Sequence, residues 1–457
     1  GKALRASGTS TLLLMLAACG GGGGGVEPIS PPPSSVAPIP TPTPAPTPTP
    51  TPTPLPIANR NFDTSEFRNS NAAVTSGAIA AYNLGATGKG VKLAVIDSGI
   101  NPGLSEFAGR IDPASRDVAG NRPLADESGH GTAVTATAAA AKDDVWMHGV
   151  APDATILAFR ADTPGSCTQT TGEDSGCKFA TTAIAQGVDA AVASGARVIN
   201  MSLGGSAPGT ALLAALQRAV SAGTVIVISA GNDGEDPATG GSADPFAAVP
   251  AATYPGHVIV AGSVGTLDRS TQQVSGLDTI SAFSNRAGTA QNNVLMALGA
   301  GVRTIDESGD RFLYSGTSFS APTITGAAAL LAQLFPNLSG AQIVDILFRS
   351  ADDLGAPGTD PIYGRGRLNI ARAVQPIGAT SLAGSAIPVT GTSADAPPAS
   401  GDAPVKNQGL GAIILDGYSR AFAVNLARTI RVAQPSEPLR RALAGSVRIA
   451  GASTGTL

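Results

Sequence analysis

The sequence predicts an α/β fold: a doubly wound, mainly parallel sheet with helices on both faces, flanked by low-complexity linkers. Between residues 61 and 374, short apolar and β-branched runs alternate with Ala-rich stretches of helical length, as expected of strand–helix–strand units. Residues 225–228 are apolar at every position, which indicates a strand buried on both faces. Both flanks are rich in Gly, Pro, Thr and Ser, which cannot build a core.

The individual elements follow from these patterns in chain order. Apolar runs of strand length, rich in Val and Ile, predict parallel strands at residues 91–96, 154–159, 197–201, 224–229 and 257–262. Longer Ala-rich or Leu-rich stretches between and after them predict helices at residues 131–141, 179–193, 210–222 and 317–335.

The beginning of the chain indicates export. Lys2 and Arg5, an apolar run at residues 11–18 and the sequence Leu-Ala-Ala-Cys at 16–19 are typical of a signal peptide that ends in a lipobox. We therefore expect residues 1–18 to be removed and Cys19 to carry lipid, the alternative being an ordinary cleaved signal with an incidental Cys. Residues 19–60, Gly-rich and then Thr-Pro repeats, are predicted to form an extended spacer.

Composition and charge argue against a nucleic-acid partner. The 457 residues carry a formal net charge of −4 and are 42% hydrophobic, enough for a sizeable core. No cluster of Lys and Arg provides the positive patch that nucleic-acid binding needs, so we expect no nucleic-acid partner.

Two of the three cysteines lie in one polar loop. Cys167 and Cys177 stand in Pro-Gly-Ser-Cys and Ser-Gly-Cys-Lys. In an exported protein a local disulfide is the favoured reading, with two free thiols or a metal pair as alternatives. No Cys or His stands nearby at zinc-site spacing, so no metal site is predicted.

Two motifs supply a carboxylate and a base, which a serine nucleophile needs at neutral pH. Asp97 follows an apolar strand in Val-Ile-Asp-Ser-Gly, where the ligand-facing residues of an open α/β sheet lie. His130 opens an Ala-rich helix in Ser-Gly-His-Gly-Thr. Only two other histidines exist, His148 and His257, and neither has such a setting, so we expect both to be structural.

Two further motifs supply a nucleophile and an oxyanion donor. Ser318, in Gly-Thr-Ser-Phe-Ser-Ala-Pro, begins an apolar helix, where free amides and the helix dipole stabilise negative charge; its alternative role is an N-cap. Asn232, in Ser-Ala-Gly-Asn-Asp, follows a buried strand and can donate to an oxyanion; its alternative role is a plain turn residue. Each motif is weak alone, and together they indicate a serine nucleophile site.

The four motifs, in this order, resemble the subtilisin-like serine proteases over about residues 65–373. The resemblance implies an endopeptidase that works through an acyl-enzyme. Asp97 would orient His130, His130 would take the Ser318 proton, and Asn232 with the Ser318 amide would hold the oxyanion. It also implies two segments that flank the substrate backbone: Ser202, Leu203, Gly204, Ser229, Ala230 and Gly231.

The same resemblance sets expectations for partners. Protein substrates are implied, and no cofactor is required for the chemistry. Many relatives bind structural calcium, for which no ligands can be matched in this sequence. Phe319 stands where relatives often carry Met, which removes an oxidation-sensitive sulfur beside the nucleophile. Residues 19–60 cannot form the folded inhibitory propeptide that many relatives have.

Residues 375–457 are predicted to be a linker and the start of a translocator region. Residues 416–430 resemble the stretch before the barrel of autotransporter proteases, some of which also carry a lipobox and a Pro-rich spacer. This resemblance implies a passenger displayed at the outer membrane and cell surface by a barrel that is missing from the sequence, with the enzyme's own linker among its substrates.

Two other functions remain as alternatives. A catalytically inert subtilisin-like passenger, used as an adhesin or scaffold, would not require all four catalytic positions to be filled, as they are here. An α/β-hydrolase esterase would need a second Gly after the serine, but residues 316–320 read Gly-Thr-Ser-Phe-Ser, and the order Asp, His, Ser differs from that of the α/β hydrolases.

Overall fold

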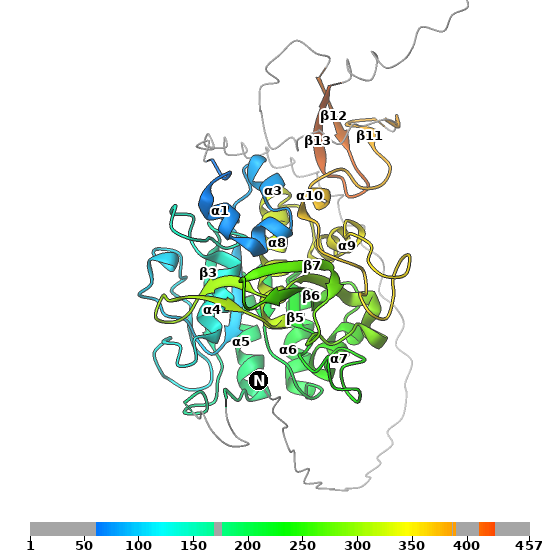
Figure 1. The fold of residues 1–457 in the computed structure, drawn as a ribbon. Helices are drawn as coiled ribbons and strands as arrows, with labels where there is room; N and C mark the ends of the chain where they lie inside the picture. The colour runs from blue at the N-terminus through cyan, green and yellow to red at the C-terminus, as the bar shows by residue number, and fades with distance from the viewer. Residues whose placement is uncertain (1–60, 169–175, 386, 390–410, 426–457) are drawn as a thin grey trace, which may run out of the picture. The chain divides into compact units, whose positions relative to one another are not determined.

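The computed structural model describes residues 61–168, 176–385, 387–389 and 411–425, all within one unit of the chain (Figure 1). The predicted signal peptide, Cys19 and the spacer lie outside the described residues.

An eight-stranded sheet forms the centre of the fold, in the order β2-β3-β1-β4-β5-β6-β7, with β8 also paired to β6. Every neighbouring pair is parallel except β6 and β7. The predicted mainly parallel sheet is therefore confirmed. Its strands are β1 (Lys92–Asp97), β2 (Arg116–Asp117), β3 (Thr155–Arg160), β4 (Val198–Met201), β5 (Val225–Ser229), β6 (Val258–Asp268), β7 (Gln273–Ile280) and β8 (Val294–Leu298).

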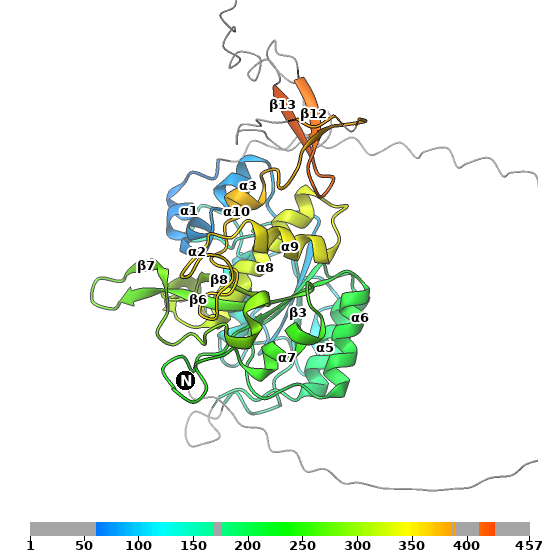
Figure 2. The same ribbon diagram turned by 90° about the vertical axis from the view of Figure 1, so that its right-hand side faces the viewer.

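Helices cover both faces of this sheet. Figures 1 and 2 show α5, α6 and α7 on one side of it and α8 and α9 on the other. The helices are α1 (Ser65–Asn69), α2 (Asn71–Thr75), α3 (Ile79–Asn83), α4 (His130–Ala139), α5 (Thr181–Ala193), α6 (Thr210–Ser221), α7 (Pro245–Thr253), α8 (Thr317–Leu334), α9 (Gly340–Arg349) and α10 (Ile370–Ala373), with 3-10 turns η1 (Ser105–Phe107) and η2 (Gly288–Asn293).

The core divides into two layers because side chains alternate across each strand. In β1, Leu93 and Val95 pack with α4 and α8, whereas Ala94 and Ile96 pack with α5 and α6. A strand buried on both sides in this way is apolar at every position, which is the pattern that the sequence displays.

The predicted elements all form, and the main difference lies in β6. We expected this strand to end at residue 262, but it continues to Asp268, because its second half leaves the parallel sheet and pairs with β7 as an antiparallel hairpin (Figure 2). Most residues of β7 are exposed, so its sequence contains no apolar run from which this strand could be predicted. Helix α9 was also missed, although Ser339 and Gln342 form a capping box that the sequence displays.

Two smaller sheets lie later in the chain. Strands β9 (Val302–Ile305) and β10 (Arg311–Tyr314) form an antiparallel pair shortly before α8. Strands β11 (Ser381–Leu382), β12 (Gly411–Leu415) and β13 (Ala421–Asn425) form a three-stranded antiparallel sheet.

The β12–β13 hairpin packs on the core that precedes it. Ile414 and Phe422 are fully buried in the cluster that contains α8 and α9, and the Phe422 ring lies 5.8 Å from that of Phe335. The domain boundary at residue 374 and the translocator assignment remain predictions. The structure adds that residues 411–425 contact the α8–α10 region; residues 426–430 of the predicted translocator segment lie outside the described residues.

In the described ranges, no helix combines the length and apolar character that crossing a membrane requires.

Candidate active site

The end of β1 meets the first turn of α4, and this meeting joins two of the predicted residues. Asp97 is the last residue of β1 and is 1% exposed, and His130 is the first residue of α4. Asp97 Oδ1 lies 2.8 Å from His130 Nδ1 and also accepts from the Ser98 backbone nitrogen at 2.8 Å. Because a carboxylate can only accept, the imidazole carries a proton on Nδ1, which leaves Nε2 as the basic nitrogen when the ring is neutral.

The same contact sets the acidity of His130. Burial lowers the pKa of the imidazole, but the charge of Asp97 and its hydrogen bond outweigh burial, and the charge of Asp126 acts in the same direction as Asp97. The pKa of His130 is therefore raised above its ordinary value of 6.5. The side chain is 34% exposed, so an incoming group can reach the ring.

Asp126 connects these two segments, and none of the sequence motifs above includes it. It is 7% exposed. Asp126 Oδ1 accepts from Ser98 Oγ at 2.9 Å and from the Gly129 nitrogen at 3.0 Å, and Oδ2 accepts from the nitrogen and hydroxyl of Thr132, both at 2.8 Å. The turn after β1 is thereby tied to the start of α4. The available signal was an acidic residue shortly before a predicted helix, since acidic side chains near a helix start accept from free amides.

The start of α8 places Ser318 and Asn232 together. Asn232 Oδ1 accepts from the backbone nitrogen of Thr317 at 2.8 Å and from its hydroxyl at 3.0 Å. With that oxygen occupied, the Nδ2 group of Asn232 is left to donate elsewhere. A side-chain carbon placed on Gly316 would lie 3.7 Å from Asn232 Nδ2 and 3.8 Å from the Ser318 nitrogen. Two donors therefore border one space in front of Gly316.

Pro322 frees the carbonyl of Ser318 for a contact outside α8. A helical residue at position 322 would donate to Ser318 O, but proline has no N–H. Ser318 O instead accepts from Ser202 Oγ at 2.7 Å, and Ser318 Oγ donates to Ser202 O at 3.4 Å. The serine is thus held against the segment that follows β4.

His130 reaches the same turn of α8 through Phe319. The two rings meet edge to face, with centroids 5.9 Å apart, and Tyr314 stacks on Phe319 at 4.9 Å. Among the described residues the Ser318 hydroxyl donates to Ser202 rather than to His130. Catalytic hydrogen bonds are often long or misaligned before substrate binds, so this geometry is compatible with a base–nucleophile pair.

The two predicted substrate segments follow β4 and β5 and lie side by side. Ser229 Oγ donates to Leu203 O at 2.8 Å, which joins them. Ser202 is in contact with Ser318, as described above, and Gly204 is exposed. These segments sit at the carboxyl ends of neighbouring parallel strands, the edge at which open α/β sheets bind ligands.

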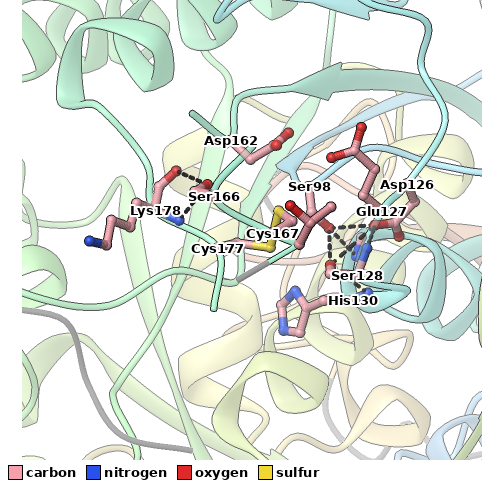
Figure 3. Close-up of a disulfide and its surroundings, with 12 residues drawn as sticks. Ser98, Asp126, Glu127, Ser128, His130, Asp162, Ser166, Cys167, Cys177 and Lys178 are labelled. Atoms are coloured by element: carbon pink, nitrogen blue, oxygen red, sulfur yellow. Dashed lines mark hydrogen bonds between the residues drawn. A yellow bond between two sulfur atoms is a disulfide. The ribbon is translucent and has the colours of Figure 1, made fainter. Parts of the chain in front are cut away.

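Cys167 and Cys177 are joined by a disulfide. Figure 3 draws the bridge with its surroundings, which include Asp126, Ser128 and His130. Ser166 Oγ, beside the bridge, accepts from the Lys178 nitrogen at 3.0 Å and so draws together the two ends of this loop. The disulfide therefore lies near the segment that carries His130.

The other two histidines lie in structural surroundings. His148 is 1% exposed and packs among the rings of Phe62, Phe67 and Tyr82. His257 stands between α7 and β6, where its backbone nitrogen donates to Tyr254 O at 3.2 Å.

Within the described part of the chain, a cavity is found away from this edge of the sheet. In residues 61–168, 176–385, 387–389 and 411–425, no group of three or more His, Cys, Asp or Glu side chains could hold a metal ion. A cavity of about 450 Å³ lies between α7, η2 and α9, and it contains none of the predicted site residues. Serine, histidine and carboxylate chemistry needs no cofactor. Structural calcium stays a prediction without ligands.

Comparison with known proteins identifies the family. Residues 88–366 match the Subtilase family. Subtilisin E of Bacillus subtilis (strain 168) is 35% identical over 300 residues, covering 65% of this chain and 68% of its own. The subtilisin of Bacillus pumilus is 34% identical over 300 residues, covering 65% and 95%, and subtilisin BL of Lederbergia lenta is 31% identical over 298 residues, covering 64% and 93%. The chain therefore belongs to the subtilase family of serine endopeptidases.

Proposed function

We propose that this endopeptidase cuts protein substrates with Ser318 as nucleophile, His130 as general base and acid, Asp97 as the residue that orients His130, and Asn232 as oxyanion donor. The observation that carries the proposal is the 2.8 Å contact between Asp97 and His130 beside the start of α8. At that start, Asn232 Nδ2 and the Ser318 nitrogen border one space.

In the acylation step, Ser318 Oγ attacks the scissile carbonyl carbon and its proton passes to His130 Nε2. The negative charge that develops on the carbonyl oxygen is stabilised by Asn232 Nδ2 and the Ser318 amide, and Asp97 stabilises the imidazolium. The C–N bond then breaks, and His130 returns the proton to the leaving amine.

In the deacylation step, a water molecule gives a proton to His130 and attacks the acyl-enzyme. The ester bond to Ser318 breaks, the second product leaves as an acid, and Ser318 regains its proton. Each role uses a group at the carboxyl edge of the sheet, and none requires a metal ion.

The residues 202–204 and 229–231 are proposed to bind the substrate backbone. Both segments leave the ends of parallel strands, and they are joined by the bond from Ser229 to Leu203. An extended peptide can add to such an edge through main-chain hydrogen bonds.

Labelling and proteolysis together test the catalytic proposal. A fluorophosphonate probe should modify Ser318 in the purified chain, and the chain should cleave casein, whereas Ser318→Ala should do neither. Ser320→Ala, which removes a neighbouring buried hydroxyl of the same helix, is the matched control and should keep labelling. A folded, unlabelled Ser318 would instead favour the inert adhesin or scaffold.

We further propose that the enzyme is exported, anchored by lipid on Cys19 and displayed at the cell surface as the passenger of an autotransporter, with its own linker among its substrates. The support is the lipobox, the Thr-Pro spacer and the likeness of residues 416–430, all taken from the sequence. Mass spectrometry of the mature amino terminus tests the anchor: acylated Cys19 is expected, and an unmodified terminus further along would refute it.

A further inference from the structure

The loop that carries Asn232 is fastened on both sides by one residue from a distant part of the chain. Asn285 is 1% exposed. Its backbone nitrogen donates to Gly231 O at 3.1 Å, and its side-chain oxygen accepts from the Asp233 nitrogen at 2.7 Å. The residues immediately before and after Asn232 are therefore both bound to Asn285.

Asp244 fixes the orientation of the Asn285 amide. Asn285 Nδ2 donates to Asp244 Oδ1 at 2.9 Å, and Asp244 Oδ2 accepts from the Gly205 nitrogen at 3.1 Å. Because the carboxylate can only accept, the amide of Asn285 must turn its nitrogen to Asp244 and its oxygen to Asp233. The backbone nitrogen of Asp244 also donates to Ala230 O at 2.8 Å, which ties Asp244 to the same loop.

The packing around this pair is closed. A side-chain carbon on Gly231 would lie 2.5 Å from Asp244 Cγ and 2.6 Å from Asn285 Nδ2, and Gly231 has a φ of +102°. No substrate group fits between these atoms. Burial, the largest effect, and the charge of Asp233 raise the pKa of Asp244 to about 6, against the bonds from Gly205 and Asn285. The two bonds that Asp244 accepts favour its ionised form.

We propose that Asn285 is a positioning residue that holds Asn232 Nδ2 where the oxyanion forms, and that Asp244 keeps the Asn285 amide in the orientation this requires. The inference rests on the proposed function, in which Asn232 is the donor. A hydrogen bond weakens steeply as its geometry departs from linear, so loosening both neighbours of Asn232 weakens transition-state stabilisation rather than substrate binding.

A double-mutant cycle with a peptide p-nitroanilide substrate tests the proposal. Asn285→Ala should lower kcat by about tenfold to a hundredfold with KM within about twofold, since the loss is confined to the transition state. When Asn232 is already replaced by Ala, adding Asn285→Ala should lower kcat by less than about threefold, because nothing remains to be positioned. An equal factor in both backgrounds would overturn the proposal.

Exchanging the two side chains gives a second, independent test. In Asn285→Asp, the new carboxylate faces the carboxylate of Asp244. In Asp244→Asn, the new amide nitrogen faces either the Asn285 Nδ2 group or the Gly205 nitrogen, both of which are donors. Each single variant should therefore lower kcat. The exchange of both, Asn285→Asp with Asp244→Asn, restores a donor and an acceptor at all three side-chain bonds with unchanged net charge. Its kcat should return to within about threefold of the parent; absence of rescue would contradict the orienting role of Asp244.

Asn369 provides a matched control. Its side-chain oxygen accepts from the Arg372 nitrogen at 2.9 Å and its nitrogen donates to Asp352 Oδ1 at 2.8 Å, the same pattern away from the site. Asn369→Ala should lower thermal stability and leave kcat unchanged. If Asn285→Ala does not fold, the exchanged pair decides the matter. An unlabelled Ser318 in the parent chain would refute the proposed function, whereas additive losses in a labelled chain would refute this inference alone.

Discussion

Two buried aspartates, Asp97 at the end of β1 and Asp416 beside β12, are held in opposite ways. Asp97 Oδ1 accepts from Ser98 and His130, while its Oδ2 has no hydrogen-bond partner among the described residues. Both oxygens of Asp416 are occupied: Oδ1 accepts from the nitrogens of Tyr418 and Arg420, and Oδ2 accepts from Ile377 and the Arg420 guanidinium.

The difference lies in what each partner can do. Arg420 is always charged, is 3% exposed, and also donates to the carbonyls of Ala373 and Gln375 at 2.6 and 2.7 Å. These two bonds join the β12–β13 hairpin to the end of α10, whereas the pairing with Asp416 lies within the hairpin. His130, by contrast, can gain and lose a proton, and its side chain stays partly open to solvent. The Asp416–Arg420 pair can only hold a structure together, whereas the Asp97–His130 pair can move a proton.

Replacing the carboxylate of Asp97 should give the largest effect on activity. Asp97→Asn can no longer fix the imidazole tautomer or stabilise the imidazolium, and the matching change in another serine protease lowers kcat by about 10⁴. We expect a loss of that order with the fold retained, measured by steady-state kinetics and circular dichroism. Asp416→Asn should leave kcat within about twofold, since a change in a buried pair remote from the catalytic residues acts on stability instead.

Replacing the cation of the Asp416–Arg420 pair should have the opposite effect: stability falls and activity is kept. Arg420→Met leaves Asp416 buried without its counter-ion, and breaking a buried pair from one side costs about 3–5 kcal/mol. The variant should unfold at lower temperature while the kcat of the folded fraction is unchanged. Unaltered stability would show that the hairpin contributes nothing to the domain.

Removing the disulfide should lower stability by less than Arg420→Met does. Cys167 and Cys177 are separated by 10 residues, and cross-links that close loops of this size stabilise by about 2–3 kcal/mol in the chain-entropy treatment. Cys167→Ser combined with Cys177→Ser should therefore lower the free energy of unfolding by about that amount in denaturant titrations. Unchanged stability of the variant would show that hydrogen bonds around Ser166 suffice to hold this loop.

The pH dependence of activity should report the Asp97–His130 contact directly. Catalysis needs neutral His130, and Asp97 raises the pKa of the ring above 6.5, so kcat/KM should rise with pH through a value above 6.5. In Asp97→Asn, where the charge is gone, the acid limb should move to lower pH. An identical limb in both proteins would mean that another group titrates.

Glu106 should make stability fall with rising pH, whereas His130 makes activity rise, and the expected effect is smaller. Burial, then the charges of Asp143 and Glu66, raise its pKa to about 7 from an ordinary 4.5. Between these values the folded state holds a proton that the unfolded state has released, so stability falls as pH rises from about 4.5 to about 7. Glu106→Gln should therefore raise the melting temperature above pH 7, with the gain shrinking towards pH 4.5.

The sequence by itself determined the α/β class, the core strands and helices, and the residue types at the catalytic edge. This was possible because those signals are local: an apolar run sets β1 and places Asp97 at its end, and an Ala-rich stretch sets α4 behind His130. The chain order of Asp97, His130 and Ser318 then indicated the family and the catalytic role of each residue.

Only the tertiary structure decided which distant loops meet. Asn285 is 52 positions from Asp233, and Asp126 is 28 from Ser98, and no periodicity records such a contact. The same holds for Arg420, which ends the turn between β12 and β13: nothing in the sequence of that turn indicates that its guanidinium is buried against Ala373. A local pattern reports which face of an element is apolar, whereas the partner of a loop depends on how the whole sheet and its helices pack.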